Sequence, residues 1–430
     1  MPGRGGSLTV LYYFLLLLTP FWNYSRLPQF GESLTLIKVV GAIVLFLAAI
    51  KVVFTRQRTC LLSFAESRLF FLLVGIASLS AIAMSQEGWW RSPMLSYISF
   101  VAYLFATLAF VDSLERLKRS CYVVLFSMLL ASVFVYSQYV KYGATRPGGV
   151  IGDANYYALS AVSMLPMTVM MFPSATRFQK AFLLVCGFSL TASTLLGQSR
   201  GGVLTLGCCL LYLLVRTRRK VLFLSGAVVA VMALILILPR TGLDRLQEDE
   251  EWGNQISTFA RIELLKAGAN MVAANPLVGI GLGSFKPMSS VYNPGVVRPQ
   301  MGHNTYLEVA AELGIHAALV FTGIMVLSWR RARRSGKVMA ERGDAAAEQV
   351  ALAIETGLAS FAAGATFLSA EYVKHLWILV FFGLALARIS KLQKEGAALA
   401  PPAVAQKGPG HGAQRKTGPA RLRSSLGRYR

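Results

Sequence analysis

Charged residues are scarce in this chain. Only 15% of its 430 residues are Asp, Glu, Lys or Arg, whereas 55% are hydrophobic. A soluble domain of this size does not need so much apolar surface, so this composition argues against a soluble enzyme and favours a protein that crosses a membrane several times. Acidic residues are the scarcest charged type, with 20 Asp and Glu against 43 Lys and Arg, which gives a net charge of +23.

Cysteine is also rare, and no two cysteines have the CxxC spacing of a metal site. None lies in the longest polar segment between the apolar runs, so we expect no disulfide framework there. Any reaction that the protein catalyses should therefore not depend on a metal held by protein ligands, and we also expect no cofactor. The five cysteines are Cys60, Cys121, Cys186, Cys208 and Cys209.

Apolar runs recur along the whole chain. A helix needs roughly 20 apolar residues to cross about 30 Å of hydrocarbon, and the sequence predicts about twelve such helices. The first run resembles a signal peptide, but no small-residue cleavage site follows it, and Trp22 and Tyr24 are typical of an interfacial belt. We therefore expect an all-α polytopic membrane protein. The predicted helices cover residues 8–22, 34–54, 69–85, 94–111, 121–140, 155–172, 181–198, 202–215, 221–238, 304–329, 350–370 and 372–388.

The basic residues fall in alternate segments between these helices. With the N-terminus in the cytoplasm, 30 of the 43 Lys and Arg residues lie on the cytoplasmic side. This distribution is the one expected from the positive-inside rule, and it places both termini in the cytoplasm. The basic excess therefore indicates membrane orientation and attraction to anionic lipids, and we expect no nucleic-acid partner.

The predicted helices define four regions. Residues 1–238 hold the first nine helices, residues 239–303 form the larger outer loop, and residues 304–390 hold the last three helices. Residues 391–430 are a basic tail without apolar periodicity, which we expect to be disordered in the cytoplasm. Within the outer loop, the apolar spacing predicts an amphipathic helix at about 257–274 that ends before an Asn-Pro pair. The glycine-rich turn that follows lacks the spacing and the βαβ setting of a dinucleotide site.

Three side chains on the predicted outer face are suited to one chemistry. Arg200 lies in the sequence QSRGG, Arg261 lies on the loop helix, and His303 lies where an apolar run begins. Taken singly, they could be an interfacial anchor, a solvated helix face and a helix cap. Taken together, two permanent cations that match phosphate oxygens and an imidazole that accepts a proton near neutrality suit a phosphate-bearing substrate attacked by a hydroxyl.

Five segments resemble the bacterial O-antigen ligase and O-antigen polymerase superfamily. The resemblance covers residues 150–320 approximately and implies a membrane glycosyltransferase with a GT-C-like helical architecture. Such an enzyme transfers glycan from an undecaprenyl-diphosphate carrier to an acceptor on the periplasmic face of the bacterial inner membrane, without a metal or a nucleotide sugar. The segments are GVIGDANYYALS, QSRGG, the helix that carries Arg261, NPLVGIGLGSF and HNTYLEVAAELG.

The resemblance also implies roles for individual residues. His303 corresponds to the family's essential histidine, the candidate base for the acceptor hydroxyl, while Arg200 and Arg261 correspond to the arginines that bind the diphosphate. Asp153 and Asn155 match a GD-N element to which we assign only site shaping. Glu312, which shares a helix face with Glu308, is expected to orient the backbone or the histidine. The histidines at 316, 375 and 411 are weaker candidates.

Several functions stay open at this point. A ligase and a polymerase share the donor and differ in the acceptor, which is lipid A–core for one and another carrier-linked repeat for the other; the motif set favours a ligase. Protein O-glycosylation is a further alternative. A transporter of lipid-linked sugars would also use outer arginines, but it would show charged or broken helices near the bilayer midplane and paired repeats. A sensor or scaffold would leave the arginines unexplained. One displacement without a covalent intermediate should invert the anomeric carbon.

Overall fold

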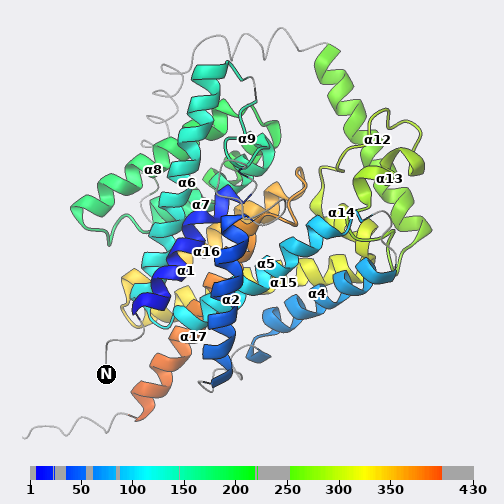
Figure 1. Cartoon of the computed structure of the whole chain (residues 1–430). Helices are drawn as coiled ribbons and strands as arrows, with labels where there is room; N and C mark the ends of the chain where they lie inside the picture. The colour runs from blue at the N-terminus through cyan, green and yellow to red at the C-terminus, as the bar shows by residue number, and fades with distance from the viewer. Residues whose placement is uncertain are drawn as a thin grey trace, which may run out of the picture. The chain divides into compact units, whose positions relative to one another are not determined.

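The computed structural model describes residues 6–22, 24, 35–54, 62–83, 88–144, 146–217, 220 and 252–399. Every regular element in these residues is a helix, which confirms the all-α prediction (Figure 1). The elements are α1 (Gly6–Leu18), the short 3-10 helix η1 (Thr19–Phe21), α2 (Leu36–Phe54), α4 (Ala65–Ala83), α5 (Arg91–Phe110), α6 (Leu114–Tyr142), α7 (Ala154–Met170), α8 (Arg177–Leu196), α9 (Arg200–Arg216), α12 (Trp252–Ala274), α13 (Phe285–Tyr292), α14 (Thr305–Leu313), α15 (Ile315–Glu341), α16 (Ala345–Gly364) and α17 (Lys374–Leu399).

Six of the described helices are long and apolar enough to cross a membrane, namely α2, α4, α5, α6, α8 and α17. A shorter apolar stretch runs through α1 and η1. Helices α7 and α9, at 17 residues each, are slightly shorter than those six. The helix predicted at 221–238 lies outside the described residues. The protein is therefore a polytopic helical membrane protein, and the count of twelve spans stays a prediction.

The prediction of one continuous helix over 304–329 is wrong. The helix breaks at Gly314, whose φ of +88° separates α14 from α15. A Cβ atom at this position would lie 2.1 Å from the carbonyl oxygen of Leu277, so the loop before α14 packs into the break only because residue 314 is glycine. The amide of Ile315 donates to the carbonyl of Pro276 at 2.9 Å and closes the junction. Helix α14, with only nine residues, is too short to span a bilayer.

Two other boundaries differ from the predicted ones. Helix α12 begins at Trp252, earlier than the predicted 257, and ends at Ala274 as predicted. Helix α17 continues to Leu399, so residues 391–399, assigned from sequence to a disordered tail, are helical. The rest of the predicted tail lies outside the described residues. Contacts divide the chain into a unit of Met1–Lys391, which contains the helical core, and a unit that begins at Leu392.

Helix α17 is the central helix of the first unit. In its apolar stretch 78% of the residues are buried, against 28% for α2. Its Trp377 stacks on Phe100 of α5 with ring centroids 5.2 Å apart and also contacts Phe70 of α4 at 5.0 Å. Aromatic side chains have large apolar surfaces, so this cluster holds α4 and α5 against α17.

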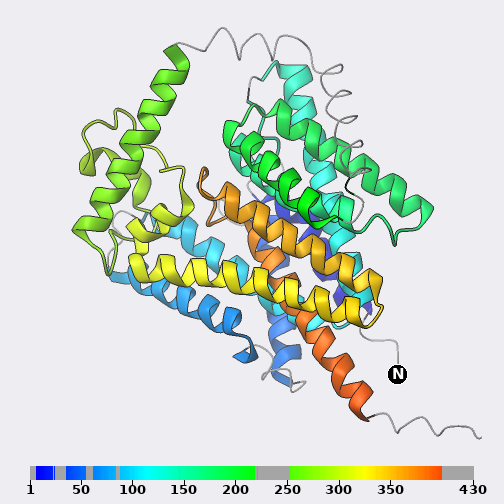
Figure 2. The same ribbon diagram turned by 180° about the vertical axis from the view of Figure 1, so that it is seen from behind.

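Two buried carboxylates connect helices that are distant in sequence. Glu66 of α4 accepts two hydrogen bonds from Arg331 of α15, at 2.6 and 2.8 Å. Glu355 of α16 accepts from Tyr212 and Arg216 of α9. Removing one partner would leave a buried charge uncompensated, so each pair holds its helices in one register. Figure 2 shows α15, in yellow, lying between α4 in blue and α16 in orange.

Candidate functional site

The candidate site is built on the first residues of three helices. Asp153 caps α7 by accepting from the amides of residues 155 and 156, Ser199 caps α9 by accepting from the amide of Gly202, and Asn304 caps α14 by accepting from the amide of Leu307. These residue types are preferred caps because a short polar side chain satisfies an amide that the helix leaves free. Each helix start also carries a partial positive charge, which favours the binding of anions there.

Contacts bring these three helix starts together. The Oδ1 atom of Asn155 accepts from Ser199 Oγ at 2.7 Å, which joins the start of α7 to the start of α9. A Cβ atom on Gly201 would lie 2.7 Å from the side chain of Leu368, so α9 approaches the loop before α17 closely. The carbonyl of Leu368 in turn accepts from Thr305 Oγ1 at 2.7 Å, at the start of α14. Arg200 and His303, which adjoin these contacts, therefore belong to one region.

Helix α12 reaches the same region by packing on α14. A Cβ atom on Gly268 would lie 2.7 Å from the side chain of Leu307, so the absence of a side chain lets the two helices touch. Arg261 lies seven residues before Gly268. Seven residues are about two helical turns, so both residues lie on the same face of α12. Arg261 therefore lies on the side of α12 that contacts α14.

Three arginines from different segments form a concentration of positive charge. Burial lowers the pKa of the Arg261 guanidinium, and the charges of Arg200 and Arg146 lower it further. In the described part of the chain none of the three forms an ion pair with a carboxylate. Permanent cations that repel one another and lack acidic partners are suited to a ligand with several negative charges.

His303 is next to this cluster. Burial lowers the pKa of its imidazole below the ordinary 6.5, and the charge of Arg261 lowers it further, whereas Asp153 raises it. The imidazole is therefore neutral at pH 7, the form that accepts a proton. Its backbone has a φ of +53°, which is uncommon for a residue with a side chain and costs free energy.

A buried hydrogen-bond chain supports this backbone conformation. The amide of His303 donates to Ser369 Oγ at 3.2 Å, and the Ser369 hydroxyl donates to the carboxylate of Glu308. Glu371 lies in the same loop as Ser369, and burial together with the charge of Glu312 raises its pKa to about 8. Burial and the charge of Glu371 also raise the pKa of Glu308. At neutral pH we therefore expect at least one proton on this pair of carboxyl groups.

Glu312 holds the backbone of the glycine-rich turn. Its carboxylate accepts from the amides of Gly283 and Phe285, at 2.9 and 3.0 Å, and from the hydroxyl of Tyr372 at 3.0 Å. The sequence left open whether Glu312 orients the backbone or His303. Its three hydrogen bonds are to two backbone amides and to the hydroxyl of Tyr372, and none is to His303. Glu312 thereby connects α14 to the turn before α13 and to the loop before α17.

We expect the substitution Glu312→Ala to destabilise the protein strongly. The change leaves the buried amide of Phe285 and the partly buried amide of Gly283 and hydroxyl of Tyr372 without their acceptor, and each unsatisfied buried group costs about 1–3 kcal/mol. The measurement is thermal unfolding of the purified protein in detergent. Glu341→Ala, at the exposed end of α15, is the control and should leave the melting temperature unchanged. Equal melting temperatures for the two variants would contradict this role.

Sequence reasoning missed two members of the site. The first is Arg146, whose Nη2 atom donates a hydrogen bond to Asn155 Oδ1 at 3.4 Å. The positive charge of Arg146 lowers the pKa of both Arg261 and His303. Its presence in the same polar segment as the GD-N element was the signal that could have identified it. Ser369 gave no such signal, because it contacts the amide of a residue 66 positions away. In the described part of the chain no group of three or more His, Cys, Asp or Glu side chains is placed to hold a metal ion.

Comparison with protein families identifies this region. The sequence profile of the family described as O-Antigen ligase matches residues 182–322. This part of the chain is similar to the O-antigen ligase family. The match includes Arg200, Arg261, His303 and Glu312 and covers α8 through the start of α15. No curated protein matches the sequence. The apolar helices and this similarity together indicate an integral membrane protein.

Proposed function

We propose that this protein is a ligase-type glycosyltransferase that transfers glycan from undecaprenyl diphosphate to an acceptor such as lipid A–core. The observation that carries the proposal is the convergence of Arg146, Arg200 and Arg261 beside His303, at three helix starts and without acidic ion-pair partners among the described residues. A diphosphate has at least two negative charges and several acceptor oxygens. It would match both the guanidinium groups and the free amides of the helix starts.

In the proposed mechanism His303 accepts the proton of the attacking acceptor hydroxyl. The hydroxyl oxygen forms a bond to the anomeric carbon while the bond from that carbon to the diphosphate oxygen breaks. The electron pair of the broken bond stays on the departing diphosphate, whose growing charge Arg200 and Arg261 stabilise. One displacement of this kind inverts the anomeric configuration. Neither a metal ion nor a nucleotide sugar takes part.

Asn155, Arg146 and Asp153 are the residues that shape the proposed site. Asn155 Oδ1 accepts from both Ser199 and Arg146, so one amide oxygen positions the start of α9 and the third guanidinium. Asp153, whose carboxylate is bound to the amides of α7, adds a fixed negative charge near His303 that partly offsets the arginines. We propose that both residues shape the site without touching the reacting atoms.

The proposal also includes the orientation of the protein in the membrane and the architecture of its helices. The site would face the periplasm from the inner membrane, with both termini in the cytoplasm, as the distribution of basic residues predicts. The helical bundle would have the GT-C-like architecture that the resemblance implies. A polymerase or a protein O-glycosylation enzyme would use the same donor site, so only the acceptor separates the three reactions.

The direct test is transfer by the purified full chain. The assay supplies carrier-linked glycan and one of three acceptors: lipid A–core, a second carrier-linked repeat, or an acceptor protein. We expect product with lipid A–core, an inverted anomeric linkage by NMR, and the same rate after treatment with EDTA. Product with the carrier-linked repeat alone would indicate a polymerase. Movement of labelled carrier across liposomes without any product would indicate a transporter.

A further inference from the structure

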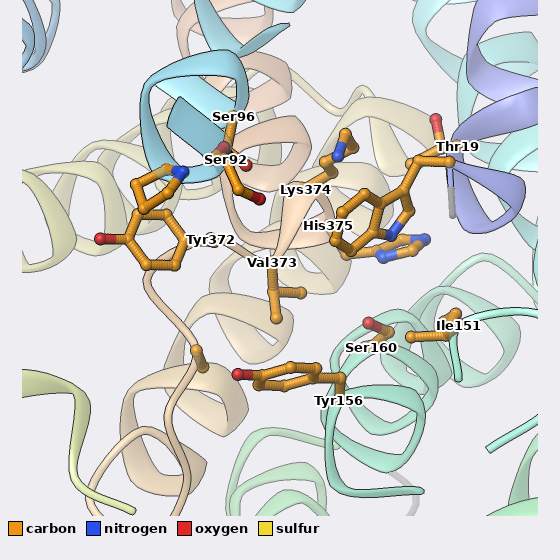
Figure 3. Close-up of a pocket in the computed structure, with 13 residues that line it drawn as sticks. Thr19, Ser92, Ser96, Ile151, Tyr156, Ser160, Tyr372, Val373, Lys374 and His375 are labelled. Carbon is orange, nitrogen blue, oxygen red and sulfur yellow. Dashed lines mark hydrogen bonds between the residues drawn. The ribbon is translucent and has the colours of Figure 1, made fainter. Parts of the chain in front are cut away.

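A cavity of about 180 Å³ lies between α5, α7 and the start of α17 (Figure 3). Lys374 and His375 line it from α17, Ser92 and Ser96 from α5, and Tyr156 from α7. Figure 3 shows these side chains around a common space. Neither the three arginines nor His303 line this cavity, but it adjoins the candidate site, because its lining residues Tyr372 and Tyr156 bond to Glu312 and Asp153.

Lys374 is a buried cation without an anionic partner in the described part of the chain. Its side chain is 7% exposed, and its Nζ atom lies 3.9 Å from the centre of the Trp22 ring. It is also the first residue of α17, where the helix dipole adds positive potential. The cation–π contact offsets only part of the loss of hydration. The neighbouring Nε2 atom of His375 is buried and has no hydrogen-bond partner among the residues that the structure describes. Both groups are suited to bind a ligand with acceptor oxygens.

A larger groove of about 430 Å³ continues from this cavity. The two spaces share Trp22, Ser92, Ser96 and Lys374. The groove runs between α1, α2 and α5, and small or aliphatic side chains form most of its wall; among them are Gly41, Ala42, Leu45, Leu95, Ile98 and Ala102. A polar cavity with a cation at one end of an apolar groove matches an amphiphile with an anionic head and a hydrocarbon tail.

We propose that this groove binds an anionic glycerophospholipid, with one acyl chain between α2 and α5 and the phosphodiester on Lys374. Lys374 begins the apolar stretch of α17 and is therefore at the depth where lipid phosphates lie. A phosphodiester has one negative charge, which Lys374 balances at the cavity end of the groove; Lys38 of α2 also lines the groove. A diphosphate has at least two, and it fits the arginine cluster of the active site better. This proposal does not rest on the proposed function.

The test measures lipid binding to the delipidated full chain in detergent, by native mass spectrometry and by thermal unfolding. The probes are phosphatidylglycerol, phosphatidylcholine with the same acyl chains, farnesyl phosphate and inorganic phosphate. We expect phosphatidylglycerol alone to raise the melting temperature, by several degrees at a concentration of about 100 times its Kd. Equal shifts with phosphatidylcholine would overturn the role of the charge. A Lys374-dependent shift with inorganic phosphate or farnesyl phosphate would overturn the assignment of a glycerophospholipid.

Two substitutions test the two ends of the groove. Lys374→Met removes the charge and keeps the length, and replacing a buried cation by an apolar side chain preserves folding. It should abolish the shift with phosphatidylglycerol, whereas Lys180→Met, whose Nζ also lies over an aromatic ring, should keep it. Ala42→Phe fills the groove and should weaken binding at least tenfold, whereas Val53→Phe, exposed on α2 and outside the groove, should not. Unchanged binding in Lys374→Met or in Ala42→Phe would overturn the proposal.

Discussion

The substitution His303→Ala is expected to abolish glycan transfer. A positioned general base contributes about 10²- to 10⁴-fold to a rate, so the rate with saturating donor and acceptor should fall by at least about 10²-fold. Donor binding should change little, because the arginines remain. The measurements are the initial rate of product formation and the affinity for the carrier-linked donor.

The control for this experiment is His316→Ala. His316 is exposed at the start of α15, thirteen residues further along the chain, and the proposed mechanism gives it no role. Both variants should reach the membrane in equal amounts and unfold at similar temperatures. If His303→Ala transfers glycan as fast as His316→Ala, His303 is not the base.

Arg261→Lys is expected to have the second-largest effect. Lysine keeps the charge but cannot form two parallel hydrogen bonds to phosphate oxygens. A hydrogen bond to a charged group contributes about 1.5–3 kcal/mol, so kcat/KM for the donor should fall about ten- to hundredfold. Arg298→Lys, on an exposed part of the same outer loop, is the matched control. Equal kcat/KM values for the two variants would exclude a bidentate contact.

The pH dependence of transfer provides an independent test of the same cluster. His303 must be neutral to accept a proton, and burial together with Arg261 holds its pKa below the ordinary 6.5. The wild-type rate should therefore stay constant as the pH falls from 7 and decline only below that ordinary value. Arg261→Gln removes a neighbouring positive charge, which raises the pKa of His303. The decline should then begin at a higher pH, and an unchanged profile would contradict the coupling between the two residues.

Much of the organisation was predictable from the sequence because it depends on local patterns. Apolar runs and the positions of basic residues indicated a helical membrane protein, and the helices of the structure and the similarity to the O-antigen ligase family agree with this. The end of α12 was also predictable, since an Asn-Pro pair follows it. In contrast, the break at Gly314 depends on the carbonyl of Leu277 packing into it, a contact that no local spacing reveals.

The sequence by itself determined the helical membrane character and identified Arg200, Arg261 and His303 as candidates, because these follow from residue types and their order. Only the tertiary structure decided which groups accompany them. Arg146 joins through Asn155, and Ser369 holds the backbone of His303. The physical reason is that hydrogen bonds, charge interactions and burial act between neighbours in space, and here those neighbours come from segments far apart in the chain. The cavity around Lys374 likewise exists only because α5, α7 and α17 pack together.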